Sequence, residues 1–268
     1  MIEKNEALID EQIDISEDIC RMENLVYEKP ETLTDTEMHY CPGCGHGVAH
    51  RIIMEVVDEL GIQSQTIGVA PVGCSVLAYH YMNIDMQQAA HGRATAVATG
   101  IKRVLPEKFV FTYQGDGDLA AIGTAETIHS INRGENFLIV FINNAVYGMT
   151  SGQMAPTTLE GMVSTTSPYG RDVRTMGHPL KIADMISILP GAYYVTRQAV
   201  NTPGNVRKAK KAIQKSFEYQ KLKKGTCLVE IVSNCPSNWK STPLESNKFV
   251  AEKLIPFYPL GDIKVPKE

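Results

Sequence analysis

The architecture of this 268-residue chain can be inferred from residues 109–144, FVFTYQGDGDLAAIGTAETIHSINRGENFLIVFINN. Two apolar runs, 109–114 and 137–144, have the composition of buried strands. Between them, the apolar residues of 119–134 recur at helical spacing, and Gly134 is a natural helix stop. A strand, a helical crossover and a second strand form a βαβ unit. We therefore expect the two strands to be parallel neighbours with a right-handed connection.

The rest of the chain continues this alternation of helices and strands. The other expected elements are a helix at 47–60, a strand at 66–72, helices at 92–104 and near 180–189, a strand at 192–200, a helix at 205–223 and a strand at 226–234. This order predicts an α/β fold with a doubly wound, mostly parallel sheet. Residues 1–38 are polar and rich in acidic residues, so we predict an N-terminal extension there and one α/β domain over 39–268.

Composition limits the classes of function. Hydrophobic residues make up 43% of the chain and the net charge is −4, with one basic stretch, 207–224, on an expected helix, so an extended nucleic-acid surface is not expected. No apolar run approaches the roughly 20 residues of a membrane helix, and the acidic start lacks the pattern of a signal peptide. We therefore expect a cytoplasmic protein without membrane or nucleic-acid partners, whose clustered cysteines hold a metal or redox group.

The motif GDGD follows one expected strand and opens a helix, which is where open α/β sheets bind ligands. Gly115 and Gly117 let the backbone approach a phosphate closely, and a helix amino terminus favours negative charge. Asp116 would repel a bare phosphate unless a cation lies between them, and Mg²⁺ is the natural cation for oxygen ligands.

The next expected strand ends in NNAVYG at the same edge of the sheet. Asn144 can supply a side-chain oxygen there, and Val146 a backbone carbonyl oxygen. GDG alone is a common turn, but GDG followed one crossover later by NN is far more specific. The pair resembles the thiamine-diphosphate-binding motif, in which groups at the positions of Asp116, Asn144 and Val146 hold Mg²⁺.

Four cysteines surround these motifs: Cys41 and Cys44 in CPGCG, Cys74 in PVGCS and Cys235 in NCPSN. The last two follow expected strands, as Asp116 does, so they should share one edge of the sheet with it. Four thiolates at that edge could hold either Zn²⁺ or an iron–sulfur cluster, and one C-x-x-C pair with two distant single cysteines favours the cluster. The remaining cysteines, Cys20 in the extension and Cys227 in an expected strand, are interpreted as inert free thiols.

The order of motifs extends the resemblance to a whole family. CPGCGHG, PVGCS, HGRA, GDGDLAAIG, NNAVYGMTSGQMAPTT and a final CP resemble the beta subunit of 2-oxoacid:ferredoxin oxidoreductases from residue 40 onward. The resemblance implies a 4Fe-4S cluster on Cys41, Cys44, Cys74 and Cys235, and thiamine diphosphate with Mg²⁺ on the other motifs. It also implies oxidative decarboxylation of a 2-oxo acid, with coenzyme A accepting the acyl group and ferredoxin the electrons.

The same resemblance implies that the chain is catalytically incomplete. In the family, the glutamate that activates thiamine diphosphate comes from the alpha subunit, and no motif here would supply it. The repeated CxxCxxCxxxCP pattern of bacterial ferredoxin domains is also missing from this sequence. We therefore expect a hetero-oligomer with an alpha subunit and with further gamma and delta subunits.

Other contacts are predicted from position alone. The expected cofactor contacts beyond Asp116 and its flanking glycines are His46, Gly47, Asp118, Asn144, Val146, Tyr147 and Gly148. His91 and Arg93, in the loop before a helix, are candidate substrate neighbours, with helix capping as the alternative. The long segment 147–178 is rich in Gly, Ser, Thr and Pro and follows a strand, which favours a functional loop.

The choice of 2-oxo acid rests on the stretch after the third cluster cysteine. Relatives that act on pyruvate or 2-oxoglutarate can have a basic residue there, whereas this chain has Leu77. An apolar wall suits a branched aliphatic tail, because burying an unpaired charge is costly. We therefore predict 3-methyl-2-oxobutanoate and similar acids, with 2-oxoglutarate and then pyruvate as alternatives, since the partner subunit could provide an arginine.

Two readings of a different class compete with this one. A non-redox thiamine enzyme shares GDG and NN but has no use for four cysteines beside the cofactor. A zinc-stabilised scaffold or interaction subunit would contain zinc, lack thiamine diphosphate and be colourless, whereas a cluster makes a protein brown.

Overall fold

The computed structural model describes residues 27–266. Contacts divide the chain into a unit that ends at Pro30 and a larger unit, Glu31–Glu268, which contains every helix and strand of the described residues. Residues 1–26 of the predicted extension, including Cys20, lie outside the described residues. Residues 31–38, which the sequence analysis grouped with the extension, belong to the larger unit. There the Thr34 amide donates to the Tyr81 carbonyl at 2.9 Å, and Leu33 forms an isolated bridge with Met82.

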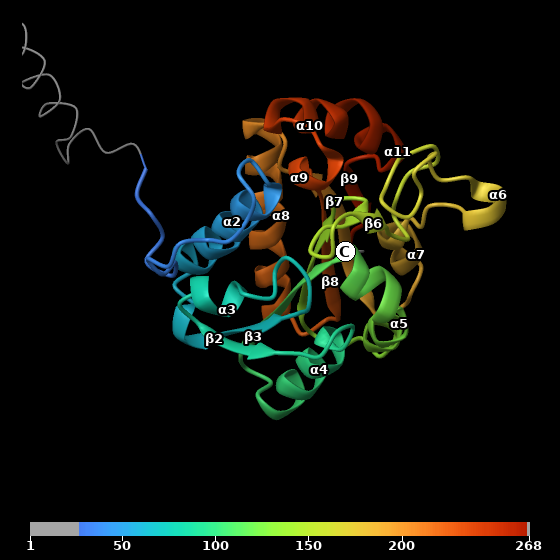
Figure 1. The fold of residues 1–268 in the computed structure, drawn as a ribbon. Helices are drawn as coiled ribbons and strands as arrows, with labels where there is room; N and C mark the ends of the chain where they lie inside the picture. Colours follow the sequence, from blue (N-terminus) through green and yellow to red (C-terminus); the bar gives the residue numbers. More distant parts are fainter. Residues whose placement is uncertain (1–26, 267–268) are drawn as a thin grey trace, which may run out of the picture. The chain divides into compact units, whose positions relative to one another are not determined.

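A seven-stranded sheet forms the centre of this unit, in the order β2-β1-β3-β4-β8-β7-β9 (Figure 1). Its strands are β1 (Thr66–Ala70), β2 (Asp85–Gln88), β3 (Phe109–Gly115), β4 (Leu138–Asn143), β7 (Ala192–Ala199), β8 (Thr226–Val232) and β9 (Gly261–Lys264). All neighbours are parallel except β7 and β9. The predicted α/β fold with a mostly parallel sheet is therefore confirmed, and so are β3 and β4 as parallel neighbours.

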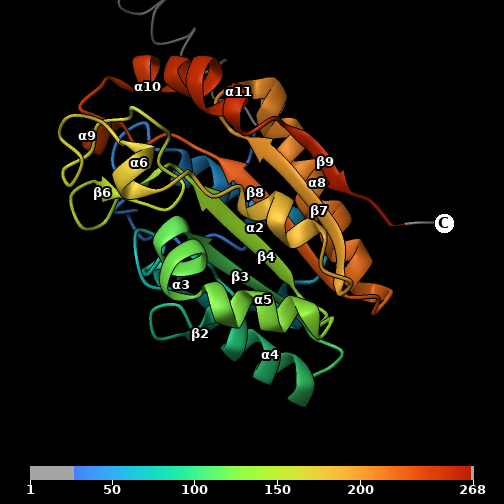
Figure 2. The same ribbon diagram turned by 90° about the vertical axis from the view of Figure 1, so that its right-hand side faces the viewer.

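Helices cover both faces of the sheet, as Figure 2 shows. The helices are α2 (Gly45–Glu59), α3 (Ala78–Tyr81), α4 (Ala94–Val104), α5 (Thr124–Asn132), α6 (Val173–Met176), α7 (Ile182–Ser187), α8 (Pro203–Lys221), α9 (Pro236–Trp239), α10 (Pro243–Phe249) and α11 (Ile255–Phe257), with the short turns η2 (Gln63–Gln65), η3 (Asp118–Ile122) and η4 (Val250–Leu254). One apolar core joins α2 and α8 to the sheet, and a second joins α4, α5 and α7 to its other face. No helix among residues 27–266 is long and apolar enough to cross a membrane.

The predicted helix 119–134 is divided into the π-helical turn η3 and α5. The division falls at Gly123, which packs directly on Gly92: a Cβ at Gly123 would lie 2.7 Å from the Gly92 carbonyl oxygen. A Cβ at Gly92, whose φ is +76°, would likewise lie 2.8 Å from the Gly123 nitrogen. Only a pair of glycines permits this approach, which brings the HGRA loop to the start of η3.

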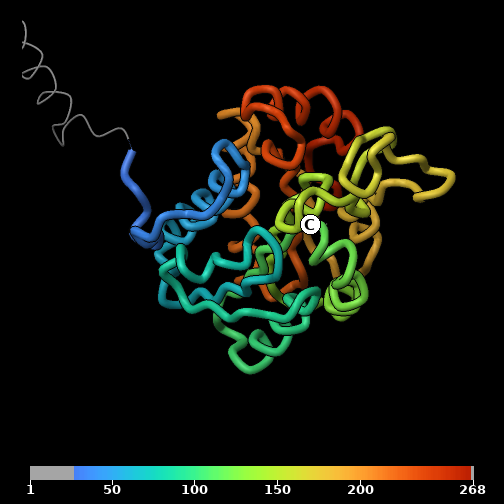
Figure 3. The backbone as a smooth tube through the Cα atoms, viewed as in Figure 1, coloured from blue at the N-terminus to red at the C-terminus, as the bar shows by residue number. Residues whose placement is uncertain are grey.

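Three groups of helices and strands were not predicted from the sequence. The first is the short helix α3 and the edge strand β2, which lie between β1 and α4 in the chain. The long segment after β4 contains the short antiparallel ribbon of β5 (Val146–Tyr147) and β6 (Gln153–Met154) as well as α6. The C-terminal segment, α9 to β9, packs through Val250, Leu254 and Tyr258 on Ala145 and Val232, which lie just after β4 and at the end of β8. The tube in Figure 3 shows how these two segments lie next to each other.

Candidate functional site

Four neighbouring strands end at one edge of the sheet, and each is followed by a candidate site residue. Cys74 follows β1, Asp116 follows β3, Asn144 follows β4 and Cys235 follows β8. Because β1, β3, β4 and β8 are consecutive in a parallel sheet, these residues share its carboxyl edge, as predicted. This is the edge at which open α/β sheets bind ligands.

A cavity of about 300 Å³ opens at this edge. Most of the predicted site residues line it: His46, Cys74, His91, Gly115, Asp116, Gly117, Asp118, Asn144, Val146, Tyr147 and Gly148. The lining also includes apolar side chains that the sequence analysis did not single out, among them Val72, Ile122 and Met149. The two motifs and one cysteine thus face a single space.

Asp116 is buried in the wall of this cavity. One carboxylate oxygen, Oδ1, accepts the Gly117 amide at 3.0 Å, and the other, Oδ2, accepts the Thr157 hydroxyl at 2.9 Å. Burial raises the pKa of Asp116 to about 7, although these hydrogen bonds oppose the shift. A carboxylate that is buried among neutral donors fits a site in which a cation supplies the opposite charge.

The turn after β4 brings Asn144 and Val146 to the same cavity. Ala145 between them has a φ of +58°, which is uncommon for a residue other than glycine. Its amide donates to Asn143 Oδ1 at 3.2 Å, and its carbonyl accepts the Thr158 hydroxyl at 2.6 Å. These two hydrogen bonds hold a strained turn, as is common at functional sites. An Asn side-chain oxygen and a backbone carbonyl, together with Asp116, make an oxygen donor set that suits Mg²⁺.

The four candidate cluster cysteines gather beside this cavity. A Cβ at Gly148 would lie 3.2 Å from Cys74 Sγ and 3.6 Å from Cys235 Sγ, so the absence of a side chain there leaves space between the two sulfurs. Burial, with a smaller contribution from the neighbouring cysteines, raises the pKa of Cys44 to about 11 and that of Cys74 to about 12. Thiolates in such a place need a metal group to stabilise them.

Asn234 and Asn238 join the cysteine segments to one another. The Gly45 amide donates to Asn234 Oδ1 at 2.8 Å, so the CPGCG loop is tied to the segment that carries Cys235. Asn238 Nδ2 donates to Cys235 Sγ at 3.2 Å and to the Gly148 carbonyl at 2.8 Å.

Among residues 27–266, no three His, Cys, Asp or Glu side chains are close enough to hold one metal ion.

The two candidate histidines differ in their surroundings. His46 is buried, its ring stacks on that of Tyr40 at 5.1 Å, and its Nδ1 lies 2.8 Å from the Tyr113 hydroxyl. Burial lowers the pKa of His46 to about 4, so its imidazole is neutral in the cavity wall. His91 Nδ1 lies 2.7 Å from Asp118 Oδ1, and the Asp118 carboxylate therefore anchors the loop that contains His91.

Besides Cys41, Cys44 and Cys235, which lie beside the cavity, three predicted site residues are not part of its lining. Arg93 stands at the N-cap position of α4 without a side-chain capping hydrogen bond, and its Nη1 forms an ion pair with Glu126 Oε1 on α5 at 2.8 Å. Leu77 is half-buried at the start of α3, and Gly47 borders a separate cavity next to α8. Leu77 therefore does not line the cavity, and the substrate prediction that was based on it gains no support from this position.

Sequence analysis missed Thr157, Thr158, Tyr113, Asn234 and Asn238 as residues that shape the site. The two threonines belong to the long loop that was predicted to be functional, so its composition was the available signal. For Tyr113 and Asn234 no local signal exists, because their partners lie 67 and 189 residues away in the sequence.

Comparisons with known proteins agree with this fold. Residues 71–231 match the C-terminal TPP binding domain of thiamine pyrophosphate enzymes. The ketoisovalerate oxidoreductase subunit VorA of Methanothermobacter marburgensis is 44% identical over 239 residues, which are 89% of this chain and 50% of VorA. The 2-oxoglutarate synthase subunit KorB of Methanocaldococcus jannaschii is 39% identical, over 81% of this chain and 78% of KorB. This chain thus spans about half the length of VorA.

A solved structure is similar as well: 2-oxoglutarate:ferredoxin oxidoreductase from Magnetococcus marinus, with 2-oxoglutarate, coenzyme A and succinyl-CoA bound. It is 27% identical with a TM-score of 0.71, over 85% of this chain and 74% of that one. Fold and site thus define a thiamine-diphosphate-binding α/β domain. Within that class, the chain belongs to the beta-subunit family of 2-oxoacid:ferredoxin oxidoreductases, as the order of its motifs predicted.

Proposed function

We propose that this chain binds thiamine diphosphate, Mg²⁺ and a 4Fe-4S cluster in a 2-oxoacid:ferredoxin oxidoreductase that forms acyl-coenzyme A. One observation carries the proposal: the cavity that contains Asp116 and Asn144 also contains Cys74, and Gly148 separates Cys74 from Cys235. A diphosphate site and a cysteine cluster that share a wall suit a reaction in which electrons leave the cofactor for a nearby acceptor.

Each part of the site has a role in this proposal. Asp116, Asn144 and the Val146 carbonyl would hold Mg²⁺, and the backbone that opens η3 would receive the diphosphate. Cys41, Cys44, Cys74 and Cys235 would hold the cluster. When bound, thiamine diphosphate supplies the nucleophilic carbon and the electron sink for decarboxylation, and the cluster accepts single electrons. The protein's own part is to orient these groups, with the neutral ring of His46 as one fixed wall.

For the substrate we propose a branched-chain 2-oxo acid such as 3-methyl-2-oxobutanoate. Val72, Ile122 and Met149 give the cavity apolar walls, which favour an aliphatic tail over a second carboxylate. The name of VorA, a ketoisovalerate oxidoreductase subunit, supports the same choice. The name of KorB and the 2-oxoglutarate bound in the solved relative make 2-oxoglutarate the second candidate, followed by pyruvate.

The proposed activity requires partners. An alpha subunit would supply the activating glutamate, further gamma and delta subunits would complete the complex, and ferredoxin would accept the electrons in the cytoplasm. The relatives named as subunits support assembly with other chains.

The test is anaerobic purification of the chain with its native partners. We expect bound thiamine diphosphate, about equal iron and acid-labile sulfide, and viologen reduction that requires coenzyme A and is fastest with a branched-chain acid. Preference for 2-oxoglutarate would move substrate selection to the partner subunit. Zinc without iron would favour the scaffold alternative, and thiamine diphosphate without iron would favour a non-redox thiamine enzyme. Fully loaded protein that reduces viologen with none of these acids would contradict the proposal.

A matched pair of cysteine variants tests the cluster ligands. Cys235→Ala should lose iron and the brown colour, because Cys235 is one of the four proposed ligands. Cys227→Ala should keep both, because Cys227 is buried within β8, where it pairs with Leu138 in β4 and Tyr194 in β7. If Cys235→Ala retained as much iron as Cys227→Ala and the unmodified chain, Cys235 would be excluded as a ligand.

A further inference from the structure

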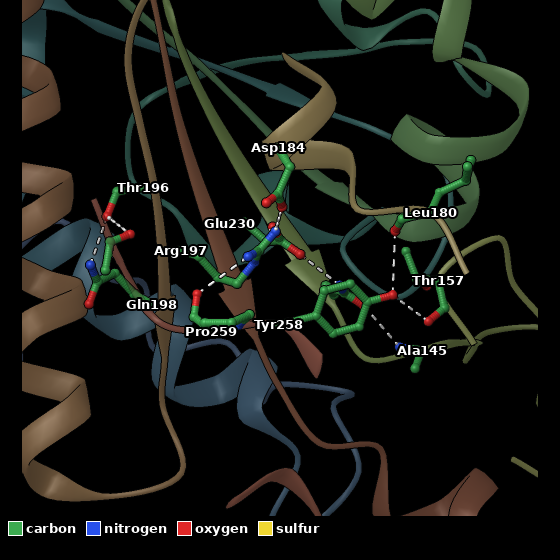
Figure 4. Close-up of polar contacts among 12 residues, drawn as sticks. Ala145, Thr157, Leu180, Asp184, Thr196, Arg197, Gln198, Glu230, Tyr258 and Pro259 are labelled. Carbon is green, nitrogen blue, oxygen red and sulfur yellow. Dashed lines mark hydrogen bonds and ion pairs between the residues drawn. The ribbon is translucent and has the colours of Figure 1, made fainter. Parts of the chain in front are cut away.

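A buried residue of the long loop after β4 holds the Asp116 carboxylate in place by a hydrogen bond. Thr157 is completely buried, and its hydroxyl donates to Asp116 Oδ2 at 2.9 Å. The carbonyl of Thr157 in turn accepts the Tyr258 hydroxyl at 2.7 Å (Figure 4). Tyr258 is also completely buried and lies just after α11, 101 residues further along the chain. The C-terminal segment therefore reaches Asp116 through a single intermediate residue.

The turn that contains Asn144 is held in a similar way, by a hydrogen bond to a buried side chain. Asn143 is completely buried, and its Oδ1 accepts the Ala145 amide at 3.2 Å. Its Nδ2 donates to Glu230 Oε1 at 2.7 Å, on the neighbouring strand β8. Glu230 therefore fixes the side chain that stabilises the left-handed Ala145, and Ala145 sets the direction of the residues on both sides of it.

These two sets of contacts meet at Arg197 on β7, as Figure 4 shows. Arg197 Nε donates to Glu230 Oε2 at 2.7 Å, and the guanidinium lies 5.3 Å from the centre of the Tyr258 ring. Arg197 also donates to the carboxylate of Asp184 and, at 3.3 Å, to the Pro259 carbonyl. Its side chain is 1% exposed and that of Glu230 is fully buried, so the arrangement is rigid.

We propose that Arg197, Glu230 and Tyr258 form one buried assembly that positions the protein ligands of the Mg²⁺ site. The assembly acts on Asp116 through Thr157 and on the turn of Asn144 through Asn143. The inference rests on the proposed function, because it assumes that Asp116 and Asn144 hold the cation. None of these five residues lines the cavity, so they are positioning residues. Mg²⁺ demands near-ideal octahedral geometry, whereas Ca²⁺ accepts flexible geometry. Fixed ligands therefore favour Mg²⁺, and looser ligands lose that preference.

The experiment measures how much Mg²⁺ or Ca²⁺ the full chain, purified with its partner subunits and stripped of cofactor, needs in order to bind thiamine diphosphate. Thr157→Val removes the hydroxyl with little change of shape. We expect it to raise the half-saturating Mg²⁺ concentration by about tenfold, as loss of a residue behind a metal ligand typically does. The Ca²⁺ requirement should rise much less, and Thr157→Ser should restore the Mg²⁺ value.

Tyr258→Phe should change the Mg²⁺ requirement in the same direction. Added to Thr157→Val it should have little further effect, because the two residues act along one route to Asp116. The matched control is Thr196→Val, which removes an equally buried hydroxyl that donates to the Gly261 carbonyl at 3.1 Å. We expect this control to bind both cations as the unmodified chain does, with circular dichroism showing that all variants are folded.

Several results would overturn the inference. One is an unchanged Mg²⁺ requirement in both Thr157→Val and Tyr258→Phe. Another is an equal loss of Mg²⁺ and Ca²⁺ binding in Thr157→Val and Thr196→Val, which would indicate general destabilisation instead of positioning. If the unmodified chain binds no thiamine diphosphate with either cation, the proposed function itself fails and the inference fails with it.

Discussion

Replacing Arg197 with methionine should destabilise the folded chain by about 3–5 kcal/mol, because it leaves the Glu230 carboxylate buried without its cation. Nε of Arg197 and Oε2 of Glu230 are 2.7 Å apart, and both side chains are shielded from water. Methionine preserves most of the apolar volume, so the loss reflects the stranded charge more than a cavity. For a unit of this size, such a loss lowers Tm by on the order of 10 °C.

The dependence on pH identifies the stranded charge as the cause. Burial raises the pKa of Glu230, and Arg197 opposes that shift, so the pKa should rise further in Arg197→Met. Between the ordinary pKa of a glutamate and this higher value, the folded variant binds more protons than the unfolded one. The stability of the variant should therefore decrease as pH rises through that window.

Urea unfolding at pH 5.5 and pH 8, followed by circular dichroism, measures both effects. The loss of unfolding free energy in Arg197→Met, relative to the unmodified chain, should be larger at pH 8 than at pH 5.5. Adding Glu230→Gln removes the stranded charge while keeping an acceptor for Asn143, so the double variant should regain most of the stability and lose the pH dependence. A loss below about 1 kcal/mol at pH 8, or the same loss at both pH values, would refute the reasoning.

Three further predictions concern single residues. Gly148→Ala should lower the iron content of the chain, because its Cβ would lie 3.2 Å from Cys74 Sγ; unchanged iron and sulfide content would contradict this. Asn238→Ala removes a 3.2 Å hydrogen bond to the last cluster cysteine, so a redox titration followed by electron paramagnetic resonance should give a more negative cluster potential than in the unmodified chain. Burial lowers the pKa of Lys102 from 10.5 to about 8, so the folded chain binds fewer protons than the unfolded chain in that interval, and its stability should rise with pH there. Urea unfolding of Lys102→Met between pH 8 and pH 10 should show a smaller rise.

The central strands could be predicted because each is a mostly apolar run. In β3, β4 and β8, nearly every residue is buried on both faces of a parallel sheet, and this produces runs such as LIVFI and TCLVEIV. The edge strands gave no such signal. The sequence of β2 is DMQQ, mostly exposed, and β9 is four residues of mixed character at the other edge. Edge strands have solvent on one side, so polar residues are tolerated and the pattern disappears.

The local part of the site could be predicted for a related reason. Asp116 and Asn144 stand in short motifs at strand ends, and the order of the parallel strands places both at the same edge of the sheet. Thr157 could not be assigned, because its role depends on the fold of a 32-residue loop. Arg171, which is buried, orders that loop by donating to the carbonyls of Ala155, Pro156, Thr158, Met176, Gly177 and His178. Nothing in the sequence near Arg171 indicates which carbonyls these would be.

The elements that were hardest to predict are those that complete the site. A doubly wound sheet requires only apolar strands and amphipathic helices, and both leave periodic patterns in the sequence. A cation site with fixed geometry also requires polar partners behind its ligands, and such partners can come from any distance along the chain. Here they come from the C-terminal segment, which supplies Tyr258 to the Asp116 side and Asn238 to the cysteine side. That segment packs on residues at the ends of β4 and β8, so it connects both halves of the site to one apolar core. A change in this segment should therefore alter cofactor binding even where it touches no cofactor.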